Sequence, residues 1–410
     1  MSEQGRALVG VIGAGTMGAG IATVALEAGW RVALHDSAEG AVELARQRIR
    51  EGLARRAARS GVDADTLDDW VDARMADLTA TASATAAAAE AQLVIEAVIE
   101  DLGAKRALFR ELDEATAGDT VLATNTSALS VSAIAEAAAR PERVVGLHFF
   151  NPAPVLPLVE VVAGRQSAPW AVERAAGIVE GWGKTPIRVV DHPGFIVNRV
   201  NRPFTLEPLR LLRSGAGTVE SIDAALEAAG FPMGPFRLMD LIGIDVNLAA
   251  ARGLFEAMGR PPRLRPSPIQ EQLVAAGRLG RKTGEGFYRY VDGRSTGPAP
   301  DFAAAAPPPP RRDEDGDTIP HIVLDGPTIA ERVILAIVNE AFRALGDGVA
   351  SEEDIDMAMQ LGANHPFGPF EWAARAGIHE VVVVLDALSD EDADTFRPAL
   401  SLLRRARPRG

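Results

Sequence analysis

Short apolar runs alternate with longer helical patterns from the N-terminus to about Val190. The runs are rich in Val, Leu and Ile, which is typical of strands that are buried on both faces of a sheet. Amphipathic or alanine-rich stretches separate several of them. This alternation predicts a doubly wound α/β sheet with parallel pairing. The predicted strands are Leu8–Ile12, Val32–His35, Leu93–Glu96, Val121–Ala123, Val144–His148, Leu158–Val162 and Ile187–Val190.

Two further regions have a helical pattern. From about Ala38 the pattern runs to Arg59, pauses, and resumes to about Leu78, which predicts a helical hairpin projecting from the sheet. From Gly194 to about Met258 the pattern is helical throughout, so we expect an all-α domain after the sheet. Residues 280–290 are predicted to form a loop containing glycine and aromatic residues, and the proline-rich and charged residues 293–320 a solvated linker.

An internal repeat follows the linker. Glu207 aligns with Glu340 and Asp223 with Asp356 at one constant offset, and Gly234-Pro235-Phe236 aligns with Gly368-Pro369-Phe370 after a one-residue insertion. The repeat predicts two copies of one helical domain. The predicted domains are 1–190 (α/β), 191–292 (first helical copy), 293–320 (linker) and 321–410 (second, degenerate copy).

Composition and charge narrow the functional class. The chain has 410 residues and no cysteine, which excludes disulfides, thiol nucleophiles and cysteine-ligated metals. A net charge of −14 disfavours nucleic acid and anionic membranes as partners. The polar N-terminus does not have the pattern of a signal peptide, so a cytoplasmic location is expected. No histidine spacing suggests a metal site.

The first predicted strand leads into a glycine motif, G-x-G-x-x-G, and then into a helix. Gly13 permits the tight turn, Gly15 lets the backbone approach a pyrophosphate, and Gly18 lets helix and strand pack closely. Asp36 ends the next strand, where a carboxylate accepts from a ribose 2′-hydroxyl and repels a 2′-phosphate. The motif therefore predicts a Rossmann-type NAD site. FAD uses a similar fingerprint, but NAD is favoured because the further segments of an FAD domain are not evident.

Two more strand ends carry candidate catalytic groups. Ser127 closes a Thr-Asn-Thr-Ser cluster, which is either a substrate-binding group or part of a helix cap. His148 ends a strand between bulky apolar residues, and Glu160 lies within the apolar run Leu158–Val162. Because a lone carboxylate is costly to bury unless it is paired, we expect Glu160 to pair with His148. Such a pair lets His148 act as the general base for an alcohol whose hydride leaves for NAD.

Together these segments resemble the L-3-hydroxyacyl-CoA dehydrogenase family, in its 3-hydroxybutyryl-CoA branch. The resemblance covers nearly the whole chain. It rests on the segments IGAGTMGAGI (12–21), VIEAVIEDLGAK (94–105), TNTS (124–127), RVVGLHFFNPAPVLPLVEVV (143–162), PGFIVNR (193–199), MGPF (233–236) and GRKTGEGFY (280–288). It implies NAD-dependent oxidation of an L-3-hydroxyacyl-CoA to the 3-oxoacyl-CoA, with a short acyl chain or a 3-hydroxyadipyl group.

The resemblance also implies roles for particular residues. His148 and Glu160 would be the catalytic pair, and Ser127 and Asn198 would contact the substrate. Arg59, on the helical hairpin, is a candidate for a CoA phosphate, although it equally suits a solvated helix face. The implied NAD contacts are Gly13, Gly15, Thr16, Met17, Gly18, Asp36, Ala97, Glu100, Lys105, Asn125, Ser127 and Asn151.

Other functions and assembly states remain open at this level. One alternative is a related NAD enzyme that acts on a free 3-hydroxy acid or on a carrier-protein thioester. Another is a catalytically silent NAD-binding or acyl-CoA-binding protein. In the second helical copy Glu331 occupies the position of Asn198, so this copy is expected to be structural. The chain is then a homodimer, or a monomer whose two helical copies form an internal pseudo-dimer.

Overall fold

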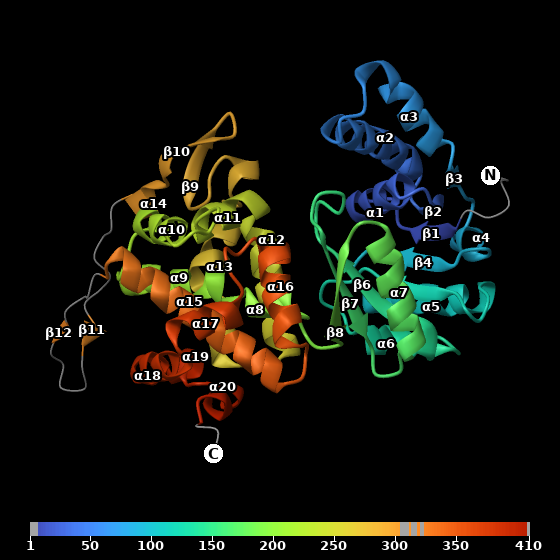
Figure 1. Ribbon diagram of the computed structural model, residues 1–410. Coiled ribbons are helices and arrows are strands. Elements are labelled where there is room, and N and C mark those ends of the chain that lie inside the picture. Colours follow the sequence, from blue (N-terminus) through green and yellow to red (C-terminus); the bar gives the residue numbers. More distant parts are fainter. Residues whose placement is uncertain (1–6, 304–310, 313–317, 320–323, 408–410) are drawn as a thin grey trace. The chain divides into compact units, whose positions relative to one another are not determined.

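A computed structural model describes residues 7–303, 311–312, 318–319 and 324–407 of the chain (Figure 1). The chain folds into two compact units, Met1–Phe195 and Ile196–Gly410. The first is an α/β unit and the second is almost entirely helical. Among the described residues no helix is long and apolar enough to cross a membrane.

The first unit is built on one eight-stranded sheet in the order β3-β2-β1-β4-β5-β6-β7-β8. Its strands are β1 (Leu8–Ile12), β2 (Arg31–His35), β3 (Leu78–Ala80), β4 (Leu93–Glu96), β5 (Val121–Thr124), β6 (Val144–Phe149), β7 (Leu158–Ala163) and β8 (Thr185–Val190). The seven predicted strands are present, and the short edge strand β3 was missed because its sequence continues the helical pattern. The predicted parallel pairing is wrong at one place, where β6 and β7 are antiparallel.

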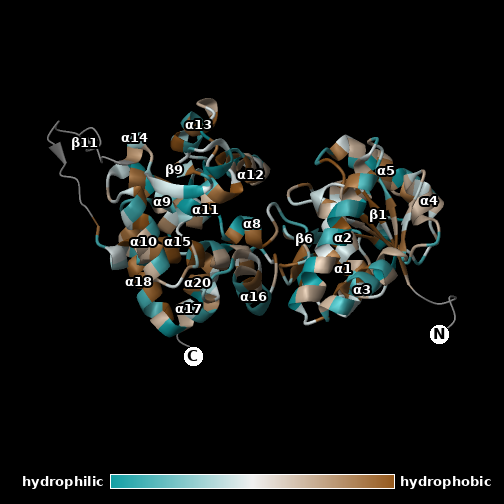
Figure 2. Ribbon diagram, turned by 90° about the horizontal axis from the view of Figure 1, so that it is seen from above, coloured by the Kyte–Doolittle hydropathy of each residue, from teal (hydrophilic) through white to brown (hydrophobic). Residues whose placement is uncertain are grey.

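Helices cover both faces of this sheet. On one face α1, α2, α3 and α7 share a core with alternate strand residues such as Val9, Val11 and Val145. On the other face Gly10 allows α4 to approach β1, since a Cβ there would lie 2.7 Å from the Ala87 oxygen. The strands accordingly colour as hydrophobic in Figure 2. The helices are α1 (Thr16–Glu27), α2 (Ala41–Arg59), α3 (Leu67–Met75), α4 (Ala84–Ala88), α5 (Leu102–Ala115), α6 (Val131–Ala135) and α7 (Pro169–Gly181).

The predicted helical hairpin is formed by α2 and α3 and projects from the sheet in Figure 1. Its inner side buries Ile49 and Leu53 of α2 and Val71 of α3 against the core of the sheet. Its outer side is rich in arginine and acidic residues. The hairpin is therefore an amphipathic extension of the α/β core.

The second unit repeats a set of four helices. Helices α9 (Pro203–Ser214), α10 (Val219–Ala228), α11 (Pro235–Ile242) and α12 (Ile244–Ala257) correspond in order to α15 (Gly326–Gly346), α16 (Glu352–Ala363), α17 (Pro369–Ala376) and α18 (Ile378–Ser389). The first part of α15 also covers the positions equivalent to residues 197–200. Its other helices are α8 (Val197–Val200), α13 (Pro268–Ala275), α14 (Pro300–Ala303), α19 (Ala393–Phe396) and α20 (Leu400–Arg405).

The two copies share a local device. Asp223 accepts a hydrogen bond from the Phe236 backbone amide at 2.9 Å, and Asp356 accepts one from the Phe370 amide at 2.8 Å. In both copies a glycine makes room for this carboxylate, since a Cβ at Gly234 or Gly368 would clash with the aspartate side chain. The repeat seen in the sequence is therefore repeated in the fold.

The region between the copies differs from the prediction. A hairpin of β9 (Tyr288–Val291) and β10 (Arg294–Pro298) begins within the predicted loop and continues into the predicted linker. The start of the hairpin is anchored by Asp240, which accepts hydrogen bonds from the amides of Phe287 and Tyr288, both at 2.9 Å. Within the predicted linker, residues 304–310, 313–317 and 320 lie outside the described residues. Two short strands there, β11 (Arg311–Arg312) and β12 (Thr318–Ile319), pair antiparallel.

Candidate active site

The glycine motif forms the turn between β1 and α1. Gly13 has a φ of +105°, and a Cβ at this residue would lie 2.4 Å from the Ala97 carbonyl oxygen. A Cβ at Gly18 would lie 1.8 Å from the Gly13 oxygen. At Gly15, in contrast, an added Cβ meets nothing within 4 Å. Side chains at Gly13 and Gly18 would thus collide with the protein backbone, whereas the space beside Gly15 is open. Gly15 is the residue that should face a pyrophosphate, and it precedes the helix that starts at Thr16 and Met17.

Asp36 holds this turn from the neighbouring strand. One carboxylate oxygen accepts from the Ala14 amide at 2.6 Å, and the other accepts from the Ala38 amide at 2.8 Å. An ionised carboxylate has about four acceptor sites, so capacity remains for a ribose hydroxyl. The residues present therefore fit a dinucleotide, and Asp36 would hold both the loop and the ribose.

A buried ion-pair network joins the ends of β4 and β5. Lys105 donates to Glu96 at 2.6 Å and lies 3.2 Å from Glu100, and the exposed fraction of the Lys105 side chain is only 1%. Glu100 accepts from the Thr126 hydroxyl and from the Ser127 amide. Burial acts to raise the pKa of Glu100, but these hydrogen bonds and the Lys105 charge lower it below its usual value. Lys105 and Glu100 thus shape the loop that carries Ser127, whose side chain is exposed.

The sequence reasoning missed the centre of this network. Glu96 is fully buried and also accepts from the Thr124 hydroxyl at 2.7 Å and the Val98 amide at 2.8 Å. A carboxylate at the end of an apolar strand was the signal that could have revealed it, as it did for Glu160.

His148 and Glu160 are brought together by the antiparallel pairing of β6 and β7, in which they are directly opposite. His148 Nδ1 lies 2.6 Å from Glu160 Oε2, and both residues are buried. Because a carboxylate accepts hydrogen bonds, this contact favours the tautomer that has its proton on Nδ1 and a lone pair on Nε2. The Phe150 ring, 4.4 Å away between centroids, and the Phe195 ring, 5.8 Å away, pack against the imidazole.

The loop after β6 is anchored on both sides. Asn125 accepts from the Phe149 amide at 2.9 Å, which ties the end of β5 to the end of β6. Lys184 donates to the carbonyl oxygens of Ala153 at 2.6 Å and Leu156 at 2.9 Å. Asn125 therefore supports the histidine strand from within the protein, and Asn151 lies exposed on the loop that follows His148.

Three further predicted residues are on other elements. Arg59 is exposed at the end of α2. Asn198 lies on α8 of the second unit, and its predicted substrate contact stays a prediction. Ala97 follows β4 directly, and its amide donates to the Ile12 oxygen at 2.7 Å next to the glycine turn.

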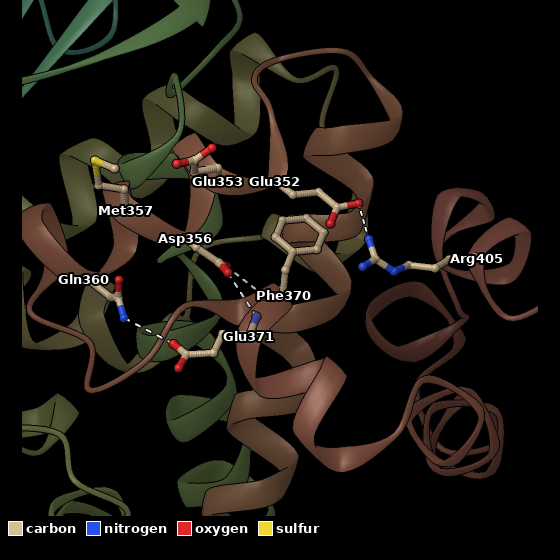
Figure 3. A pocket seen from close by; sticks show the side chains of 8 residues that line it. All are labelled: Glu352, Glu353, Asp356, Met357, Gln360, Phe370, Glu371 and Arg405. Carbon is tan, nitrogen blue, oxygen red and sulfur yellow. Dashed lines mark hydrogen bonds and ion pairs between the residues drawn. The ribbon is translucent and has the colours of Figure 1, made fainter.

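The pocket in Figure 3 is in the second helical copy. It has a volume of about 470 Å³ and lies around Asp356 and Phe370. In the first copy Tyr288 of the β9–β10 hairpin donates to the equivalent Asp223 at 2.8 Å. The pocket thus occupies the place that a hairpin tyrosine fills in the first copy.

The α/β unit with its open glycine turn, together with a helical unit, defines an NAD-dependent oxidoreductase. The profile "3-hydroxyacyl-CoA dehydrogenase, NAD binding domain" matches residues 8–192, and the profile of the C-terminal domain matches residues 194–290 and 329–407. The chain belongs to the 3-hydroxyacyl-CoA dehydrogenase family and is an NAD-dependent 3-hydroxyacyl-CoA dehydrogenase.

Individual relatives agree with this assignment. The 3-hydroxyadipyl-CoA dehydrogenase of Escherichia coli K12 is 38% identical over 97% of both chains. The crystal structure of an E. coli K12 3-hydroxybutyryl-CoA dehydrogenase matches 98% of both chains with a TM-score of 0.85 and 36% identity. The (S)-3-hydroxybutyryl-CoA dehydrogenase of Ralstonia eutropha is 33% identical with a TM-score of 0.65, and covers 70% of this chain and 100% of its own. This chain therefore spans the whole length of the Ralstonia eutropha enzyme and has a further segment in addition.

Proposed function

We propose that the enzyme oxidises short L-3-hydroxyacyl-CoA thioesters with His148 as the general base and Glu160 as the group that orients it. The observation that carries the proposal is the buried contact of 2.6 Å between His148 Nδ1 and Glu160 Oε2. The carboxylate fixes the tautomer of the ring and stabilises the imidazolium that forms when Nε2 takes the hydroxyl proton. NAD, when bound, accepts the hydride from C3.

The other residues of the site have supporting roles in this proposal. Ser127 and Asn198 hold the substrate oxygens. Ser127 is exposed on the loop that Glu100 holds by accepting a hydrogen bond from the Ser127 amide. Thr16, Met17, Ala97 and Asn151 line the cofactor, and Arg59 pairs with a CoA phosphate. Two relatives are named for 3-hydroxybutyryl-CoA and 3-hydroxyadipyl-CoA, so both acyl groups are candidate substrates.

The test compares His148→Gln and Glu160→Gln with the unaltered enzyme. General-base catalysis is worth roughly 10²–10⁴-fold, so His148→Gln should lower kcat by that factor. Glu160→Gln should lower kcat less, because the amide still accepts from Nδ1–H. The dissociation constant of NADH, followed by its fluorescence, should stay unchanged in both. A His148→Gln enzyme with unaltered kcat would remove His148 from the mechanism.

The thioester carrier is tested separately. The rates of NADH formation with 3-hydroxybutyrate, its CoA thioester and its carrier-protein thioester should favour the CoA thioester, as the family assignment implies. A preference for the free acid or the carrier protein would support the alternative substrates.

A further inference from the structure

Arg202 is a buried cation for which the described part of the chain supplies no anion. Its exposed fraction is 6%, and its Nε atom is buried without a hydrogen-bond partner among the described residues. Burial lowers the pKa of its guanidinium to about 10. An unpaired buried charge is costly, so a reason is needed for arginine to be kept here.

Other buried arginines in the protein are paired. Arg199 contacts Glu340 at 2.8 Å and Asp347 at 2.6 Å, and Arg143 contacts Asp113 at 2.6 Å. These arginines stabilise the fold through ion pairs between helices or loops. Arg202 is similarly buried but forms no ion pair with any of the described residues.

The internal repeat provides a comparison within one chain. At the offset that aligns Glu207 with Glu340, Arg202 corresponds to Leu335, whose exposed fraction is 1%. The fold of the repeat therefore accepts leucine at this position. At the same offset Asn198 corresponds to Glu331. The unpaired arginine thus occurs in the copy that carries the predicted substrate residue, and is replaced in the copy that lacks it.

Arg202 is one helical turn beyond Asn198. The two residues are joined by a tight turn of helical sense between α8 and α9, in which Asn201 N–H donates to Val197 O and Arg202 N–H donates to Arg199 O at 3.1 Å. Arg202 itself has helical torsion angles, with φ −60° and ψ −40°. Side chains at i and i+4 share a face of a helix and lean toward its N-terminus. A long side chain at this position is therefore suited to reach back toward the group that Asn198 binds.

We propose that Arg202 binds a carboxylate at the far end of the acyl chain, and that the enzyme is selective for 3-hydroxyacyl-CoA thioesters of dicarboxylic acids. This inference rests on the proposed function, in which Asn198 contacts the substrate. In a six-carbon dicarboxylic chain three C–C bonds of about 1.5 Å separate C3 from the terminal carboxyl carbon, a span of about 4 Å. That span is similar to the rise of one helical turn, about 5.4 Å. A guanidinium fork matches a carboxylate through two parallel hydrogen bonds.

The experiment measures kcat/KM with 3-hydroxyadipyl-CoA, its terminal methyl ester and 3-hydroxybutyryl-CoA. Arg202→Leu introduces the residue of the second copy, so the fold should be retained. A hydrogen bond to a charged partner is worth roughly 10- to 100-fold. Arg202→Leu should lower kcat/KM for the dicarboxylic substrate by that factor and leave 3-hydroxybutyryl-CoA within a few fold. Arg202→Lys should fall between, because lysine keeps the charge without the fork.

The methyl ester makes the test specific. The unaltered enzyme should prefer the free terminal carboxylate to its ester, and Arg202→Leu should not. A preference for the acid that is equal in both enzymes, or an equal loss on all three substrates, would overturn the role of Arg202. Failure of the unaltered enzyme to oxidise any of the three thioesters would instead contradict the proposed function. Thermal unfolding of each variant checks that the fold is retained.

Discussion

Arg199 of α8 and Glu340 of α15 form an ion pair at 2.8 Å in which both side chains are buried. The same pair recurs with the copies exchanged, since Arg332 contacts Glu207 at 2.6 Å. In the sequence repeat Arg332 is the equivalent of Arg199, and Glu340 is the equivalent of Glu207. Reciprocal contacts of this kind characterise a two-fold symmetric dimer interface. The two helical copies thus pack as such a dimer would, within one chain.

The ion pair should make a large contribution to stability. We expect Glu340→Gln to lower the free energy of unfolding by about 3–5 kcal/mol, because the partly buried Arg263 loses its carboxylate partner and the buried Arg199 is left with Asp347. Urea unfolding measures this change. Arg188→Gln is the matched control, since its pair with Glu173 is exposed and should contribute at most about 1 kcal/mol. Equal effects of the two variants would contradict the prediction.

The reciprocal interface also predicts an assembly state. Removal of residues 324–410 exposes Arg199 and Glu207, each of which then requires the other from a second chain. We expect the truncated protein to self-associate through this face and the intact chain to be monomeric in light scattering. An intact dimer that the truncation leaves unchanged and stable would exclude the idea that the second copy replaces a partner subunit.

The glycine turn predicts opposite results at two neighbouring positions. Gly15→Ala should leave the thermal stability of the apoprotein unchanged, since the added Cβ meets open space, but weaken NADH binding by at least about tenfold. Gly18→Ala should destabilise the apoprotein itself, because its Cβ would overlap the Gly13 oxygen. Calorimetry and NADH titration separate the two effects. Tight NADH binding by Gly15→Ala would remove this residue from the cofactor site.

Asp36 should determine the choice between NAD and NADP. Asp36→Ser removes the charge that repels a 2′-phosphate and an acceptor for the ribose. The ratio of kcat/KM for NAD to that for NADP should therefore fall by about 10- to 100-fold. Because Asp36 also holds the Ala14 amide, thermal unfolding is measured alongside. A ratio that stays constant would mean that Asp36 serves the loop alone.

Stability should depend on pH through Asp240. Burial raises the pKa of this carboxyl to about 6, despite hydrogen bonds from two amides and Tyr290. Between its unfolded value of 3.8 and about 6 the folded state binds more protons, so the free energy of unfolding falls as pH rises. Relative to Asp240→Asn, the unaltered enzyme should lose stability from pH 4 to pH 6 and show a constant difference above pH 7. Urea unfolding at several pH values checks the sign. A free energy of unfolding that rises with pH in the unaltered enzyme, relative to Asp240→Asn, would refute the prediction.

The sequence by itself determined the elements whose signals are local. The glycine motif after β1, the buried carboxylate Glu160 within a valine-rich strand and the repeat around Asp223 and Asp356 are read directly from spacing and hydrophobic pattern. These features follow from backbone geometry and from the cost of burying charge. The sheet, the two helical copies and the NAD site were predicted on this basis.

The tertiary structure decided which distant groups meet. The antiparallel direction of β7 puts Glu160 opposite His148. The packing of the folded chain also pairs Glu96 with Lys105 and Arg199 with Glu340. It also buried the Nε atom of Arg202 where none of the described residues accepts a hydrogen bond from it. A hydrophobic pattern specifies which residues are buried but not which buried charges are neighbours. That depends on strand direction and helix packing, which only the folded chain fixes.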